Sequence, residues 1–171
     1  MEQACRFPTI LSIFFVPRPS SFRPSFSLDP GGQIVYKYHM KGFEDDNYCF
    51  VCGSLNSRGL KLTFSTDKKT GEVTSKAVFS RRFQGWKGVL HGGIISTVLD
   101  EIMIKAADKK GLRCVTAELT VKFKKPAFID TQYLLKGSVK DVKKKLALTE
   151  GVVLGPDNEI IATAAGKMFI L

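Results

Sequence analysis

The chain has 171 residues, of which 44% are hydrophobic and 25% charged, a composition typical of one globular domain with a buried core. Its formal net charge of +10 allows a nucleic acid, a membrane surface or a phosphate-bearing substrate as partner. The apolar stretch at residues 10–16 is far shorter than the roughly 20 residues that cross a membrane. Four cysteines do not make a disulfide scaffold in a chain of this length and fit a reducing compartment better.

Residues 1–38 differ in composition from the rest, with five prolines, only two acidic residues and no amphipathic period. This predicts an unfolded extension, or a start codon placed too early with the true start at Met40. Because acids are scarce and arginines present, an organellar transit peptide is also open. We expect a single folded domain over residues 39–171, in the cytoplasm, or in an organelle if the first segment is a transit peptide.

A Cys-x-x-Cys pair at residues 49–52 is the first motif of that domain. One such pair is half of a zinc site, and no second pair follows. The other plausible ligands are His39, His91 and Cys114. A thioredoxin-type role would need a strand before the pair and a helix after it, but a turn-like sequence follows. Structural or incidental thiols are therefore favoured, a metal bound by the pair is the alternative, and no cofactor is expected.

Secondary structure is predicted from residue 60 onward by hydrophobic periodicity and by the turn residues between segments. A helix is expected over residues 92–110, with Gly111 as its C-cap. Successive hairpins predict an antiparallel sheet, and one apolar helix against one sheet gives an α+β layer. The six expected strands cover residues 60–64, 73–79, 116–124, 133–142, 146–154 and 160–170.

The expected helix has an apolar stripe, a polar side and one acid that belongs to neither. Asp100 projects roughly 140° from the centre of the stripe, among small and apolar residues. A carboxylate there fits a contact with a second subunit, where desolvation suits an acid/base or nucleophilic group; a plain surface acid is the alternative. The stripe consists of Ile95, Val98, Leu99, Ile102 and Ala106, and the polar side, where charges are usually solvated, of Thr97, Glu101, Lys105 and Asp108.

His91, Gly92 and Gly93 stand where this helix begins. Glycine is a poor helix former, but it lets a ligand approach the backbone and leaves N–H groups open. Either the N–H of Gly93 polarises a carbonyl oxygen with help from the helix dipole, or the glycines only permit tight packing. His91 is either a helix-entry residue or a general base. Gly93 and Asp100 lie about 10 Å apart along one helix, so a shared substrate implies a site between two subunits.

Four motifs together resemble a known family. They are the Cys-x-x-Cys-Gly lead-in to Gly-Leu at 59–60, the Gln-Gly-Trp-x-Gly-Val-Leu-His-Gly-Gly run at 84–93, the acid nine residues after His91, and residues 116–126 ending in Phe-Lys-Lys-Pro. Residues 40–171 are similar to the hotdog-fold acyl-CoA thioesterases related to phenylacetyl-CoA and 4-hydroxybenzoyl-CoA thioesterases. The resemblance implies an antiparallel sheet of about six strands wrapped around one long helix. It also implies homodimers, often paired into tetramers, with active sites at the subunit interface.

The resemblance assigns catalytic roles by position. The family commonly has an Asn or Gln shortly before the His; Gly85 occupies one such position here and Gln84 is its neighbour. The remaining roles are a nucleophilic or general-base carboxylate at Asp100, a carbonyl-polarising N–H at Gly93, a positioning group at His91, and a water-orienting hydroxyl at Thr116.

The expected reaction is hydrolysis of an acyl-CoA to free acid and CoA, which is substrate rather than cofactor; an acyl-carrier protein could replace CoA. Basic residues would bind the CoA phosphates. The alternative is a non-catalytic hotdog protein that binds acyl-CoA or acyl groups. A nucleic-acid-binding module lacks any recognised motif, so neither nucleic acid nor membrane is expected as partner. The expected substrate-binding residues are Gly92, Trp86, Arg81, Arg82, Lys122, Lys124, Lys125 and the 143–145 turn, with Trp86, Met103 and Phe128 lining the acyl pocket.

Overall fold

The computed structural model describes residues 24–28, 34–38 and 44–171. Strands β1 (Pro24–Leu28) and β2 (Ile34–Tyr38) pair antiparallel, a hairpin that the sequence did not predict. The remainder of the first 38 residues, His39 and Met40 lie outside the described residues. The extension, the transit peptide and the later start therefore stay predictions. No helix in the described part of the chain is long and apolar enough to cross a membrane.

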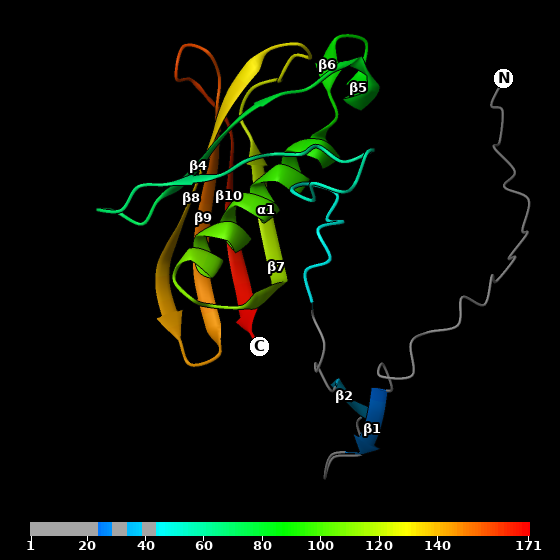
Figure 1. Cartoon of the computed structure of the whole chain (residues 1–171), viewed down its shortest axis with the longest axis vertical. Helices are drawn as coiled ribbons and strands as arrows, with labels where there is room; N and C mark the ends of the chain where they lie inside the picture. Colours follow the sequence, from blue (N-terminus) through cyan, green and yellow to red (C-terminus); the bar gives the residue numbers. More distant parts are fainter. Residues whose placement is uncertain (1–23, 29–33, 39–43) are drawn as a thin grey trace, which may run out of the picture. The chain divides into compact units, whose positions relative to one another are not determined.

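Residues 45–171 form a separate unit built on a six-stranded antiparallel sheet. The helix α1 (Gly92–Lys109) lies against one face of this sheet, as Figure 1 shows. This confirms the predicted α+β layer of six strands and one long helix. The strands, in their order across the sheet, are β3 (Ser65–Thr66), β4 (Val73–Val78), β8 (Gln132–Lys143), β9 (Leu146–Leu154), β10 (Ile160–Ile170) and β7 (Cys114–Phe123).

The prediction of a strand at residues 60–64 is wrong, because strand pairing begins only at β3. Leu60 and Leu62 are half-buried against the core, but their N–H groups donate to the carbonyls of Phe50 and Val51 in the preceding loop. The alternating burial of this segment therefore shows that one of its faces is covered. It does not show that the segment pairs with a neighbouring strand. The connection before α1 contains the 3-10 helix η1 (Arg81–Phe83) and the paired strands β5 (Gln84–Trp86) and β6 (Val89–Leu90).

The apolar stripe of α1 packs on the sheet as predicted, with all five of its residues buried. Met103 and Ala107, which belong to the small and apolar residues that the helical periodicity places around Asp100, are also fully buried in this core. The helix approaches the sheet closely at Gly137, where an added Cβ would lie 2.6 Å from the carbonyl oxygen of Ile102. At the other end the helix stops one residue earlier than predicted, with Lys110 as the C-cap, and Gly111 follows it with a φ of +75°.

Candidate active site

The hydroxyl of Thr116 on β7 donates a hydrogen bond of 2.6 Å to the carboxylate oxygen Oδ1 of Asp100 on α1. The same hydroxyl lies 3.4 Å from the sulfur of Met168 on β10. Asp100 is half-buried and Thr116 exposed, so the pair is accessible from outside the single chain. The structure therefore brings together two residues that the resemblance assigned to one reaction.

A β-bulge at Ala117 directs Thr116 toward the helix. On β10, Lys167 and Met168 pair with Glu118 and Thr116, so Ala117 has no partner in the ladder. Leu119, closer to the end of β7, packs on the core. Strict alternation from Leu119 would turn Thr116 away from the helix, whereas one extra residue reverses the alternation. The hydrogen bond to Asp100 depends on this irregularity.

The side chain of His91 caps the N-terminus of α1. Its ring nitrogen Nδ1 accepts a hydrogen bond of 2.9 Å from the N–H of Gly93. The N–H expected to polarise a carbonyl is thus held by the neighbouring imidazole. Gly85 lies against the same ring, since an added Cβ there would be 3.2 Å from Cδ2 of His91.

The segment after β7 is tied to the start of α1. The buried hydroxyl of Tyr133 accepts a hydrogen bond from the N–H of Phe128 and donates one to its carbonyl, at 2.6 and 3.0 Å. The N–H of Leu90 donates to the carbonyl of Ala127 at 2.8 Å. Phe123 lies over Gly92, with its ring 3.5 Å from where a Cβ would be. Tyr133 and Phe123 were missed from the sequence, where they resemble ordinary core residues of strands.

A cavity of about 290 Å³ opens at this helix start. Gly92 and Phe123 line it together with Lys124 and Lys125, two of the lysines that are expected to bind phosphate. Lys122 alternates to the other face of the sheet and lines a separate cavity of about 640 Å³.

The other expected substrate-binding residues lie elsewhere. Arg81 and Arg82 lie in η1 and line neither cavity, and the guanidinium of Arg82 covers the ring of Phe83 at 4.6 Å. In the 143–145 turn, Lys143 pairs with Asp141 at 3.4 Å.

Gln84 and the three expected acyl-pocket residues also differ in their surroundings. Gln84 accepts a hydrogen bond from the N–H of Gly88 at 3.3 Å through its side-chain oxygen, and so stabilises the β5–β6 turn. Trp86 is 82% exposed and Phe128 is 54% exposed. Met103 does not line an open acyl pocket, because it is buried between α1 and the sheet.

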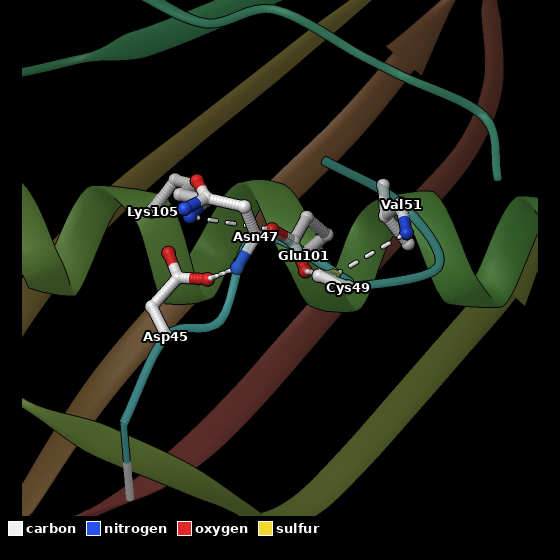
Figure 2. Close-up of polar contacts among 6 residues, drawn as sticks. All are labelled: Asp45, Asn47, Cys49, Val51, Glu101 and Lys105. Atoms are coloured by element: carbon white, nitrogen blue, oxygen red, sulfur yellow. Dashed lines mark hydrogen bonds and ion pairs between the residues drawn. The ribbon is translucent and has the colours of Figure 1, made fainter. Parts of the chain in front are cut away.

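A second polar cluster lies beside Asp100 on the helix and includes Cys49, Cys52 and Glu101. Figure 2 shows the loop of Cys49 crossing the helix at Glu101 and Lys105. Glu101 is only 14% exposed, so the expectation of a solvated side for it was wrong: the 45–62 loop covers it. Of the ligands considered for the Cys pair, His91 and Cys114 do not belong to this cluster, and His39 lies outside the described residues.

The surroundings of the cluster shift the pKa values of Cys52 and Lys105. Burial raises the pKa of the Cys52 thiol to about 12, and Glu101 and Cys49 contribute to the rise. Burial lowers the pKa of Lys105, but the negative charges of Glu101 and Cys52 outweigh this, and the pKa is raised overall. Outside the cluster, burial raises the pKa of Cys114.

Residues 87–162 match the family model of the thioesterase superfamily. A curated relative, an uncharacterized mitochondrial protein of Candida albicans (strain WO-1), is 36% identical over 90 residues. That alignment covers 50% of this chain and 39% of the relative, so the chain matches about two fifths of the relative's length.

Solved structures share the fold. A thioesterase superfamily protein superposes with a TM-score of 0.69 at 22% identity, covering 73% of this chain and 61% of its own. The Escherichia coli PaaI protein of the phenylacetic acid degradation operon gives a TM-score of 0.60 at 18% identity, covering 66% and 80%. A hypothetical thioesterase from Streptococcus pneumoniae TIGR4, solved with coenzyme A, gives 0.59 at 19% identity, covering 64% and 86%. The same protein was also solved as an Asp-to-Ala and a Thr-to-Ala mutant, at positions sixteen residues apart.

These comparisons confirm the resemblance on which the site residues were chosen. The domain of residues 45–171 has the hotdog fold, and its residues 87–162 carry the pattern of the thioesterase superfamily.

Proposed function

We propose that this protein hydrolyses an acyl-CoA thioester to a free acid and CoA, with Asp100 as the reactive carboxylate. The observation that carries the proposal is the 2.6 Å hydrogen bond between Thr116 and Asp100. The Streptococcus pneumoniae thioesterase, which binds coenzyme A, was mutated at an Asp and a Thr sixteen residues apart. Asp100 and Thr116 have the same residue types at the same separation.

In this mechanism Thr116 orients the carboxylate and the water. Its proton is donated to Oδ1 of Asp100, so its own oxygen can accept a hydrogen bond from a water molecule. Asp100 then either removes a proton from that water or attacks the thioester carbonyl itself. Both routes place negative charge on the carbonyl oxygen and break its C–S bond, and the CoA sulfur takes up a proton that water supplies. In the second route, water then hydrolyses the anhydride formed on Asp100.

The N-terminus of α1 stabilises that charge, because its first N–H groups have no partner within the helix and the helix dipole is positive there. Gly93 supplies the donor once the imidazole of His91 moves off its N–H and the substrate carbonyl takes its place. His91 is the positioning group that holds this N–H in the free enzyme. Lys124 and Lys125, at the cavity beside Gly92, bind the phosphates of CoA.

The active site is shared by two copies of the chain. Gly93 and Asp100 are about 10 Å apart along α1, too far to act on one carbonyl. Strand β7 lies at the edge of the sheet and flanks the helix, with Thr116 near its start and Phe123 at its end. If two β7 edges pair antiparallel about a two-fold axis, the Phe123 end of one copy meets the Thr116 end of the other. Gly93 of one copy then approaches Asp100 of its partner.

Thiol release from acyl-CoAs of varied chain length and aromaticity tests the activity. We expect Asp100→Asn to lower turnover by about 100-fold or more, because the amide can neither take a proton nor attack. The matched control is Asp108→Asn, which removes an exposed carboxylate two turns further along the same helix. Equal turnover in Asp100→Asn and wild type contradicts the mechanism. Acyl-CoA binding without thiol release over the whole panel supports the non-catalytic alternative.

The name of the Candida relative supports a mitochondrial location for this chain as well. A fusion of the full chain to a fluorescent protein is then expected in mitochondria, and the same fusion lacking residues 1–38 in the cytosol. Identical distribution of the two fusions contradicts a targeting role for the first segment.

A further inference from the structure

Two thiols and one carboxylate converge beside α1 without a part in the proposed hydrolysis. The sulfurs of Cys49 and Cys52 and a carboxylate oxygen of Glu101 lie within 4.8 Å of one another. Cys49 and Cys52 come from the 45–62 loop and Glu101 from the helix, about fifty positions later in the chain, and all three are half-buried. The tertiary structure, and not a local turn alone, assembles the group.

The 45–62 loop holds the sulfurs of Cys49 and Cys52 on the side that faces Glu101. The N–H of Gly53 donates to the carbonyl of Cys49 at 2.9 Å, and the N–H of Val51 donates to the sulfur of Cys49 at 3.3 Å. Gly53 is required for this turn, since a Cβ there would lie 2.4 Å from the nitrogen of Cys49. The two sulfurs are therefore positioned before any ion binds.

The donor set identifies the class of ion. Two thiolates and one carboxylate suit Zn²⁺, which takes sulfur, nitrogen and oxygen ligands in a tetrahedron. Mg²⁺ and Ca²⁺ prefer oxygen ligands only, and Cu(I) prefers sulfur without a carboxylate. The group has three members among the described residues, which leaves the fourth position of the tetrahedron for water.

The charges of the cluster also balance around such an ion. Two thiolates and a carboxylate carry three negative charges, a divalent ion supplies two positive ones, and Lys105 supplies the third. The amine of Lys105 lies 3.6 Å from Glu101 Oε1, and its side chain is 24% exposed. Half-buried charges that cancel in this way avoid the desolvation penalty of an unpaired ion.

We propose that Cys49, Cys52 and Glu101 bind a zinc-type divalent ion, which fastens the 45–62 loop to α1 next to Asp100. Its three protein ligands join the loop to the helix, so the ion holds the loop over one side of α1. The hydrolysis proposed above neither requires this site nor implies it.

Titration of the reduced full-length protein with Co²⁺ tests the site directly, because thiolate-bound Co²⁺ absorbs in the near ultraviolet and tetrahedral Co²⁺ in the visible. We expect one equivalent of Co²⁺ to bind with both signals and Zn²⁺ to displace it. Cys49→Ser and Cys52→Ser abolish the thiolate signal. Glu101→Gln leaves both sulfur ligands in place and is expected to weaken Co²⁺ binding by about 10-fold or more. Loss of a group that only supports a metal ligand already has an effect of this size. The matched controls are Cys114→Ser, which removes a thiol outside the cluster, and Asp108→Asn on the same helix.

The proposal is overturned if the wild type shows no thiolate-to-cobalt absorption, or if Cys114→Ser weakens it as much as Cys49→Ser. It is also overturned if Glu101→Gln binds Co²⁺ as tightly as the wild type. Circular dichroism checks the fold of each variant. If both serine variants unfold, the wild type and Glu101→Gln decide the question on their own. Since the signal is spectroscopic, its absence would leave the proposed hydrolysis untouched.

Discussion

In the proposed mechanism, the hydroxyl of Thr116 contributes to turnover through its hydrogen bond to the Asp100 carboxylate. A hydrogen bond to a charged group is worth about 1.5–3 kcal/mol, which corresponds to about 10–150-fold in rate if the bond acts in the transition state. We therefore expect Thr116→Ala to lower kcat by about 10–100-fold, and Thr116→Ser to retain most of it. Steady-state thiol release on a good substrate measures both.

The control for this change is Thr120→Ala, on the same strand but on the face of the sheet that lines the larger cavity. Its turnover is expected to match the wild type. If Thr116→Ala and Thr120→Ala have equal kcat, the 2.6 Å bond to Asp100 has no part in catalysis.

Burial of the Cys114 thiol makes the stability of the domain depend on pH. Its pKa is raised in the folded state, whereas the unfolded thiol ionises near its ordinary pKa of about 8.5. Above that pH the unfolded chain loses a proton that the folded chain retains, so the free energy of unfolding falls as pH rises. Below it, the full stability is present. Urea unfolding on both sides of that pH should show a smaller loss for Cys114→Ala than for the wild type. Equal losses would mean that Cys114 titrates alike in both states.

Single residues were predicted unevenly from the sequence. Asp100 stood out because its helical position matches neither the buried stripe nor the polar side, and Thr116 was chosen by family resemblance. Glu101 was placed on the solvated side, because periodicity describes only the helix itself. The loop that covers Glu101 comes from about fifty residues earlier, and no local pattern encodes that contact.

At the scale of elements, α1 packs closely on β8 because Gly137 lacks a side chain. A Cβ there would meet a backbone oxygen at 2.6 Å, and backbone cannot move aside as a flexible side chain can. Overpacking of this kind typically costs about 1–3 kcal/mol. Gly137→Ala is thus expected to lower the free energy of unfolding by at least that amount, as measured in urea.

Ser138→Ala is the matched control, because the next residue along β8 faces the opposite side of the sheet. Its free energy of unfolding should change by less than about 0.5 kcal/mol. Gly137→Ala with wild-type stability would show that α1 can shift away from the sheet at little cost.

Strands with a regular hydrophobic alternation between turn residues were predicted well from the sequence. Features that depend on which segment pairs with which were not. The bounds of β9 and β10 agree with the prediction, since turn residues flank regular alternation. The segment at 60–64 alternates in the same way but packs on a loop. The bulge at Ala117 could not be seen either, because the unpaired residue is defined by the register against β10. That bulge decides which way Thr116 faces.

At the scale of the whole molecule, the fold separates the two halves of the proposed site within each chain. The helix start with Gly93 and the carboxylate of Asp100 lie about 10 Å apart on one rigid element. No motion that preserves α1 can bring them onto one thioester, whereas two-fold pairing of β7 edges can. The separation of Gly93 and Asp100 could be deduced from the sequence, because it depends only on helix geometry. The position of β7 at the edge of the sheet, which makes pairing possible, is known only from the strand order.

Mixed dimers test the shared site. Asp100→Asn removes the carboxylate, and Gly93→Pro removes the N–H at a first-turn position where proline is tolerated. Each variant alone is expected to be inactive. Co-expressed with different affinity tags and purified through both, the mixed dimer contains one site with neither substitution and one site with both. It should therefore show about half of the wild-type turnover per dimer.

The same experiment separates the alternatives. A mixed dimer without activity would place Gly93 and Asp100 of one chain in the same site, which the length of α1 forbids unless the helix is broken. A protein that stays monomeric at assay concentration and still hydrolyses thioesters would remove the subunit interface from the mechanism. Recovery of activity only on mixing requires that each carboxylate acts on a substrate held by the other chain's helix.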